Sequence, residues 1–262
     1  MTPISRRLSL GLFGAATLVP TVAAAAPRSR LIDGPWRQFG SSGDPDHGAW
    51  ARILDRGITR GSDGIARFNY RATAKREVDA YVTAMTRVDP TTLNSSAAFA
   101  YWANLYNAIT VQVVLANFPV GSIRDIGGGL FSAGPWRTKL VEVAGRPLSL
   151  DDIEHGILRP VWQDPRVHYA VNCAALGCPD LAPRPFTAAR LAALLDAGAR
   201  AYGIHPRGVT VSAEGLVLSS IYDWFRADFG GSAAGVVAHL RQYALPELSA
   251  ALDAGAHSAA SV

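Results

Sequence analysis

The segment HYAVNCAALGCPD, residues 168–180, holds the residue types that are best suited to chemistry. It contains both cysteines of the 262-residue chain, Cys173 and Cys178, with four residues between them, and it begins with His168. Two thiols at this spacing can form a disulfide, bind a metal ion such as zinc together with His168, or leave Cys173 as a reactive nucleophile. The residue types leave these three alternatives open.

A cysteine nucleophile requires a base, and the nearest histidine in the sequence is His168. The run RVHYAVN predicts a strand over 166–172, directly followed by Cys173. Along a strand these two residues would point to opposite faces and lie about 17 Å apart. This geometry argues against His168 as the base.

His155 is the better candidate for the base, because it lies on a separate element. The sequence SLDDIEHGILR predicts a helix over 149–159, with Ser149 and the acidic residues in its first turn. Glu154 and His155 flank the apolar stripe of this helix. In this hypothesis Glu154 or Asp152 orients the imidazole, and the imidazole activates the thiol.

A long uncharged helix is predicted over 94–119, with no charged side chain between Ser95 and Pro119. Its polar amides argue against a membrane span and favour a central helix that is buried in a globular domain. Asn104 and Asn107 lie three positions apart and therefore share one face. If they were buried without partners, each would cost roughly 1–3 kcal/mol, so they are expected to bind a loop or line a site.

The remaining patterns supply the elements that must position these residues. Further helices are predicted at 47–57, 72–88, 187–203, 221–231 and 231–252, strands at 64–70 and 138–145, and a hairpin at 208–220. The predicted fold class is α+β: a single domain with a central buried helix packed on a small, mostly antiparallel sheet, and several peripheral helices. Asp223 and Asp228, five positions apart, fall on different helix faces and are predicted to have surface or capping roles.

The N-terminal sequence predicts export. Residues 1–26 combine Arg6 and Arg7, an apolar run and a small-residue cleavage zone, as in a signal peptide of the twin-arginine type. We expect an extended arm at 27–46, the α+β domain at 47–252 and a disordered tail at 253–262. The mature chain is expected in the periplasm or outside the cell, where nearby cysteines commonly pair.

Composition limits the classes of partner. Hydrophobic residues make up 49% of the chain and charged residues 18%, which is typical of a packed globular protein. Without residues 1–26 the chain has 23 basic and 21 acidic residues, a net charge of +2. Because the basic residues are scattered, no nucleic-acid partner is predicted, and no membrane span is expected in the mature chain.

Four separated blocks give the sequence a specific resemblance. The segments AFAYWANLYNAITVQVVL, PWRTKLVEVAGRPLSLDDIEHGILRP, DPRVHYAVNCAALGCPDL and LSSIYDWFRADFG resemble, in this order, the DUF547 family. This domain of unknown function occurs in bacterial exported proteins and in plant proteins. The resemblance runs from roughly residue 64 to 230 and implies a single α+β domain with no established reaction. The family motif falls on Trp102, Asn104, Tyr106, Asn107, Glu154, His155, Arg159, His168, Asn172, Cys173, Cys178 and Pro179.

The residue types in these blocks motivate one enzymatic hypothesis. A thiol, an imidazole and amide groups are the components of papain-like or transglutaminase-like acyl transfer. In this interpretation the protein is a cysteine-dependent hydrolase or acyltransferase. Its predicted catalytic residues are Cys173, His155, Glu154 and Asn107, and its predicted substrate-binding residues are Asn104, Trp102, Tyr106 and Arg159.

Two alternatives come from other classes of function. One is a non-catalytic binding module of the cell envelope, stapled by a Cys173–Cys178 disulfide, with a small molecule, peptide or glycan as its ligand. The other is a metal-binding domain that holds zinc or another divalent ion through His168, Cys173 and Cys178. Outside that second alternative no cofactor is predicted.

Overall fold

The computed structural model describes residues 27–127, 134–212 and 215–255, so the expected signal peptide lies outside the described residues. The helices are α1 (Gly48–Gly57), α2 (Lys75–Thr86), α3 (Ser95–Ala116), α4 (Arg159–Trp162), α5 (Val167–Ala170), α6 (Leu191–Gly203), α7 (Ser220–Trp224), α8 (Ala233–Arg241) and α9 (Pro246–Gly255). The strands are β1 (Ile58–Arg60), β2 (Ala66–Phe68), β3 (Val141–Val143), β4 (Arg146–Leu148), β5 (Val209–Ser212) and β6 (Gly215–Leu218). The predicted α+β class is confirmed.

The central helix is α3, as the sequence predicts. The Asn94 side chain caps it by accepting a hydrogen bond from the Ala97 amide at 3.0 Å. Most of its residues are buried, including both asparagines on the shared face. Among the described residues, no helix is long and apolar enough to cross a membrane.

The strands form three separate antiparallel hairpins rather than one sheet: β1 with β2, β3 with β4, and β5 with β6. In the β3–β4 hairpin, Ala144 and Gly145 both have positive φ angles, 51° and 70°, as a tight two-residue turn requires. Each strand has only three or four residues, so its main contribution is to fix a turn beside the helices.

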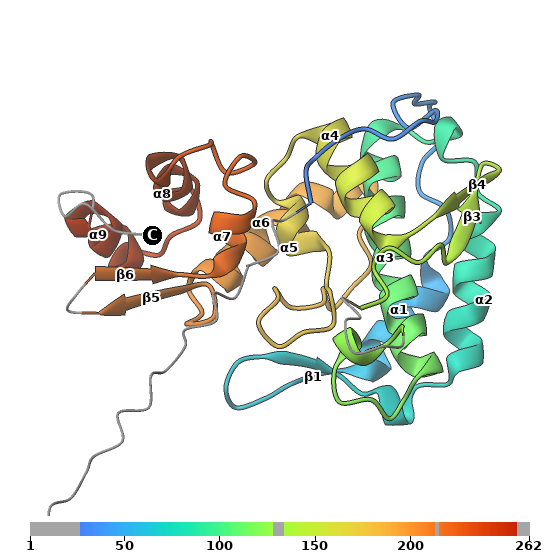
Figure 1. Cartoon of the computed structure of the whole chain (residues 1–262), viewed down its shortest axis with the longest axis horizontal. Helices are drawn as coiled ribbons and strands as arrows, with labels where there is room; N and C mark the ends of the chain where they lie inside the picture. Colours follow the sequence, from blue (N-terminus) through green and yellow to red (C-terminus); the bar gives the residue numbers. More distant parts are fainter. Residues whose placement is uncertain (1–26, 128–133, 213–214, 256–262) are drawn as a thin grey trace, which may run out of the picture.

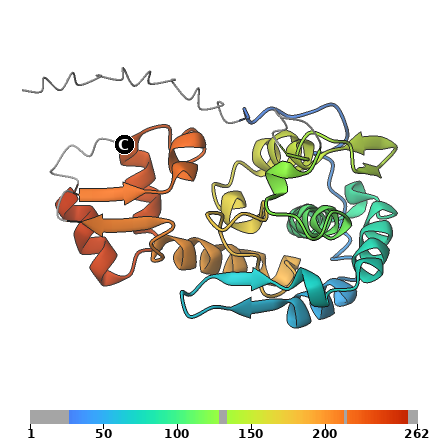
Figure 2. The ribbon, with the colours of Figure 1, turned by 60° about the horizontal axis from the view of Figure 1, so that its bottom comes forward.

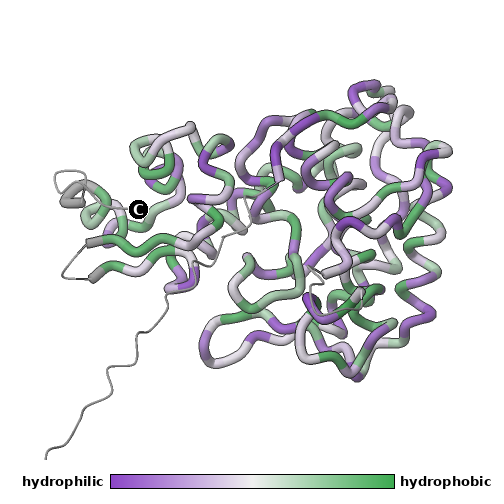
Figure 3. The backbone as a smooth tube through the Cα atoms, viewed as in Figure 1, coloured by the Kyte–Doolittle hydropathy of each residue, from purple (hydrophilic) through white to green (hydrophobic). Residues whose placement is uncertain are grey.

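Two hydrophobic clusters hold the helices together. The larger surrounds α3, where the buried Trp102 packs edge-on against Trp36 at 5.4 Å between ring centroids. The smaller joins the β5–β6 hairpin to α7, α8 and α9 and includes Tyr169 of α5. Figure 1 shows this smaller part at one end of the molecule, and Figure 2 shows α6 leading toward it from the larger part. The hairpin strands are mostly hydrophobic (Figure 3), in keeping with their place in this cluster.

The strand predicted over 166–172 is wrong, because the segment contains the short helix α5. The dipeptide Asp164-Pro165 starts the turn that precedes α5. The Asp164 carboxylate accepts a hydrogen bond from the Arg166 amide at 2.9 Å, and the Asp164 carbonyl accepts one from the Val167 amide at 3.1 Å. The β-branched and aromatic residues that follow favoured a strand, but this local start signal outweighs them. The argument that separated His168 from Cys173 by strand geometry therefore does not apply.

Candidate functional site

The strongest concentration of buried charge in the described residues is a group that we call the acid–base cluster: Glu154, His155, Arg159, His168 and Asp228. All but Asp228 are almost fully buried as whole residues. They come from three parts of the chain: the helical segment 152–162, helix α5, and the turn after α7. Buried ionisable groups with shifted pKa values are typical of functional sites, although structural ion pairs produce the same signature.

Glu154 and His155 lie on a π-helix, Asp152–Leu158, which continues into α4. Its start is a capping box, as the sequence predicts. The Ser149 amide donates to the Asp152 carboxylate at 2.7 Å, and the Asp152 amide donates to the Ser149 hydroxyl at 3.1 Å. Single π-turns often occur at functional sites.

His155 is a neutral imidazole with a fixed tautomer. Its Nδ1 lies 3.0 Å from Arg159 Nη1, and because a guanidinium can only donate, Nδ1 must accept. Burial, assisted by the positive charge of Arg159, lowers the pKa of His155 to about 4. The proton of the neutral ring therefore sits on Nε2, which is 3.9 Å from Asp151.

Asp228 joins two buried donors. Its Oδ2 accepts hydrogen bonds from Arg159 Nε at 2.6 Å and from His168 Nε2 at 2.8 Å. Burial alone would raise the pKa of Asp228, but the bonds from His168 and Arg159 lower it to about 2. Asp228 is therefore ionised at neutral pH, and His168 carries its proton on Nε2.

Glu154 faces the other side of the His168 ring. Its Oε1 lies 3.8 Å from His168 Nδ1, and the buried Tyr106 hydroxyl hydrogen-bonds to the same carboxyl group. Burial raises the pKa of Glu154, while His168 and Tyr106 oppose the rise. Phe225 packs against two members of the cluster. The His168 ring stacks on it with 4.2 Å between ring centroids, and Arg159 Cζ lies 4.7 Å from the centroid of the Phe225 ring.

The shifted pKa of His155 predicts a specific loss of stability in acid. The unfolded chain takes up a proton near pH 6.5, whereas the fold resists it until about pH 4. The free energy of unfolding therefore falls as the pH drops through this window, by as much as about 3 kcal/mol from this group. Urea titrations measure the free energy of unfolding at pH 7 and pH 4, and the difference between the two values should be smaller in His155→Gln than in the wild type. An acid-induced loss of stability as large in His155→Gln as in the wild type would contradict the assignment.

A polar cavity of about 480 Å³ borders the cluster at Arg159 and Asp228. The rest of its lining comes from the N-terminal arm and from the segment around α4, namely Ser29, Leu31, Arg37, Pro160, Gln163, Asp164 and, after α7, Ala227. Gln163 has a positive φ of 51°, a strained conformation for a residue with a side chain. The cavity thus places two guanidinium groups and two carboxylates around one polar space.

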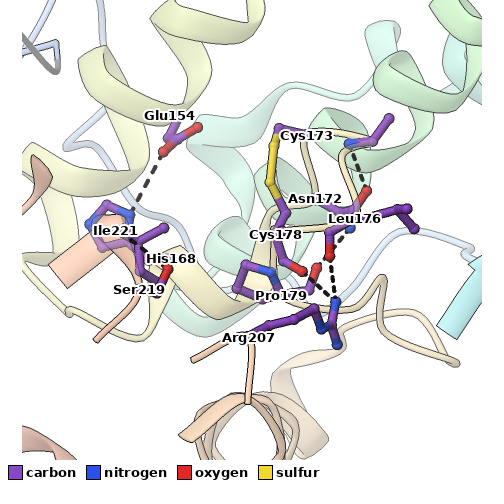
Figure 4. The surroundings of a disulfide bond; sticks show 12 residues. Glu154, His168, Asn172, Cys173, Leu176, Cys178, Pro179, Arg207, Ser219 and Ile221 are labelled. Carbon is purple, nitrogen blue, oxygen red and sulfur yellow. Dashed lines mark hydrogen bonds and ion pairs between the residues drawn. A yellow bond between two sulfur atoms is a disulfide. The ribbon is translucent and has the colours of Figure 1, made fainter. Parts of the chain in front are cut away.

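Cys173 and Cys178 form a disulfide. Of the three alternatives for the two thiols, a disulfide, a metal site or a free nucleophile, the structure shows the first. The loop that the disulfide closes is fixed by its neighbours: Asn172 accepts from the Ala174 amide at 2.8 Å, and Arg207 donates to the Cys178 carbonyl at 2.8 Å. Ala174, directly after Cys173, has a positive φ of 57°. Figure 4 draws this loop with Glu154 and His168 in its surroundings.

The asparagines of α3 bind main-chain groups. Asn104 donates to the Phe186 carbonyl at 2.8 Å and accepts from the Phe186 amide at 3.0 Å. Asn107 donates to the Ala170 carbonyl and accepts from the Asn172 amide, both at 2.8 Å. These are the loop contacts that the sequence predicts for two buried amides.

The structure brings together some of the predicted site residues and separates others. Glu154, His155, Arg159 and Tyr106 meet at the acid–base cluster. Trp102 is packed in the core, and no hydrogen bond or ion pair within the described residues joins Cys173 to His155. The assignment of these two as nucleophile and base remains a prediction.

Asp228 was missed as a site residue. The prediction of a surface or capping role for it is wrong, since its carboxylate pairs with two buried side chains. Helix periodicity misled the sequence argument, because α7 ends at Trp224 and the chain turns before Asp228. The resemblance of the surrounding block was the one available signal.

The metal alternative lacks a ligand set in the described residues. No group of three or more His, Cys, Asp or Glu side chains is placed there to hold a metal ion. Both cysteine sulfurs are used by the disulfide, and His168 Nε2 is used by Asp228.

The fold and the site define an α+β domain with a buried acid–base cluster beside a polar cavity and a disulfide-closed loop. Residues 90–202 match the family model described as Protein of unknown function, DUF547, as the resemblance of the sequence blocks predicts. The match covers the central helix, the π-helix and the cysteine loop, whereas Asp228 lies beyond it. No curated protein and no solved structure matches the chain.

Proposed function

We propose that the protein is a binding module of the cell envelope that takes a small carboxylate-bearing ligand in the polar cavity, with the disulfide as a structural staple. The N-terminal sequence supports export, and the disulfide is compatible with an oxidising compartment. Arg159 and Asp228 of the acid–base cluster form part of the cavity wall. No catalytic step is required of it.

The choice of a carboxylate as the ligand rests on Arg37. Arg37 lines the cavity, and its guanidinium donates to the Pro160 carbonyl at 3.1 Å. No acidic side chain in the described part of the chain lies within ion-pair distance of it, whereas Arg159 is already paired with Asp228. An arginine whose charge is not neutralised, at the edge of a cavity, is suited to bind a carboxylate through two parallel hydrogen bonds.

A ligand panel with matched neutral analogues tests this function. The probes are short peptides with free carboxyl termini and hexuronic acids, each compared with its amide or neutral sugar by calorimetry. We expect at least one acid to bind and its neutral analogue to bind at least tenfold more weakly. Arg37→Gln should remove the difference, and Arg190→Gln, an exposed arginine outside the cavity, should retain it. Equal binding of acids and neutral analogues, or no binding of any acid, would overturn the proposal.

A second candidate function is cysteine-dependent acyl transfer, and the surroundings of Cys173 favour it. The neighbouring Ala174 is strained, and Glu154 and His168 lie in the environment of the disulfide (Figure 4). This function requires a dithiol reductant, which is oxidised as the disulfide becomes two thiols. The Cys173 thiolate then attacks an acyl carbonyl, an alcohol or amine leaves, and water hydrolyses the thioester.

Hydrolysis of p-nitrophenyl acetate by the reduced protein tests this candidate. Reduced wild type and Cys178→Ser should release nitrophenol with a burst, and Cys173→Ser should not. If Cys173→Ser is as active as Cys178→Ser, the acyl-transfer candidate is wrong.

A further inference from the structure

The first described residues, 27–32, form a segment that we call the strap. It has no helix or strand of its own and runs beside α4, as the blue trace in Figure 1 shows. The Arg30 amide donates to the His155 carbonyl at 3.0 Å, and the Ile32 amide donates to the Gly156 carbonyl at 3.1 Å. The two donors are two positions apart, which places them on one edge of an extended chain.

The helical segment 152–162 has two free carbonyl groups for the strap because it contains a proline. Pro160 has no amide hydrogen, and it stands four positions after Gly156 and five positions after His155. The Gly156 carbonyl therefore has no donor of the α type, and the His155 carbonyl has no donor of the π type. Buried carbonyls need partners, and the strap supplies both.

Two further contacts fit a chain into this position. At Gly156 an added Cβ would lie 2.8 Å from Ile32 Cγ2, so the absence of a side chain lets the strap pack directly on the helix. At the other end, Arg159 Nη1 donates to the Pro27 carbonyl at 2.8 Å. The helix thus offers the strap two acceptors, one donor and one shallow apolar position.

Most of these contacts are made by the strap's main chain rather than its side chains. Arg28, Ser29 and Arg30 are exposed, and only Ile32 contributes a side chain to the packing on Gly156. The side chains of Leu31 and Ile32 are only partly buried where they pack against the larger hydrophobic cluster, and the chain beyond the strap is held by the buried Trp36. A peptide with the same backbone geometry could make the same contacts.

We propose that the groove on this helix, at His155, Gly156 and Arg159, is a binding site for an extended peptide and that the strap occupies it in cis. The peptide class is an extended segment with free amide hydrogens at two alternate positions and a branched apolar residue at the second of them. This is main-chain recognition of the kind used when a peptide adds to a strand edge. The inference goes beyond the carboxylate ligand proposed above, and the two sites adjoin, because Ser29 and Leu31 of the strap and Arg159 also line the polar cavity.

Fluorescence anisotropy with a labelled synthetic peptide, PRSRLIDG (residues 27–34), tests the inference on the full chain. In the wild type the strap competes with the probe. Ile32→Ser weakens the strap without changing the groove and should bind the probe at least tenfold more tightly than the wild type. The same peptide N-methylated at the Arg30 and Ile32 amides lacks both donors and should not bind.

A second variant separates the groove from other surfaces. Ile32→Ser combined with Gly156→Ala should lose the probe, because the added methyl group occupies the position of the peptide's isoleucine. Circular dichroism establishes that each variant is folded. The inference is overturned if folded Ile32→Ser does not bind the probe at millimolar concentration, or if it binds the N-methylated peptide as tightly as the parent. The N-methylated peptide keeps the test decisive even if the double variant does not fold.

Discussion

Asp228→Asn should lower the free energy of unfolding by about 4 kcal/mol. The single oxygen Oδ2 holds both Arg159 and His168, whose side chains are only 4% and 2% exposed. The substitution removes the negative charge and leaves the guanidinium buried without its counterion, a change that typically costs about 3–5 kcal/mol. Urea denaturation at pH 7, followed by tryptophan fluorescence, measures the effect.

Asp223→Asn is the matched control, five positions earlier in the same segment. Asp223 pairs with Arg226, but both side chains are well exposed, at 55% and 39%. An exposed ion pair of this kind contributes about 0.2–1 kcal/mol, so the control should change stability only slightly. If both substitutions had the same small effect, the buried ion pair would not be the stabilising contact that we infer.

Asp228 also shows where sequence reasoning about the site ends. The helical elements that carry Glu154, His155 and Arg159 follow from an apolar stripe and a capping box, both of which are local signals. Asp228 reaches the cluster through the turn after α7, and no periodic pattern predicts where a turn places its side chains. A contact between positions 69 residues apart is a property of tertiary packing.

In the fold as a whole, too, the sequence predicts the features that depend on local signals and misses those that depend on tertiary packing. The caps and the uncharged run predict α3 almost to its ends, and the turn residues predict the β5–β6 hairpin. The sequence predicts one small sheet, whereas the structure has three separate hairpins. Alternation of apolar and polar residues identifies strands, but it does not say which strands pair. The segment predicted as a strand over 166–172 contains helix α5 instead. Its β-prone residues are too few to outweigh the signal for a turn at Asp164 and Pro165.

Asn107→Leu should destabilise the protein by about 4 kcal/mol, although leucine is close to asparagine in size. The Asn107 amide holds the Ala170 carbonyl and the Asn172 amide at the point where α5 leads into the cysteine loop. Leucine leaves two main-chain groups without partners, and each buried unpaired group costs roughly 1–3 kcal/mol. Asn117→Leu is the control, at the residue that caps the C-terminus of the same helix. Asn117 is exposed, and its side chain donates to the Val113 carbonyl one turn back, so we expect a loss below about 1 kcal/mol. Because the disulfide restrains the loop only from Cys173 onward, it does not replace the bonds at Ala170 and Asn172. Guanidinium unfolding of the oxidised proteins compares the two variants, and an Asn107→Leu variant as stable as Asn117→Leu would show that the amide does not hold the loop.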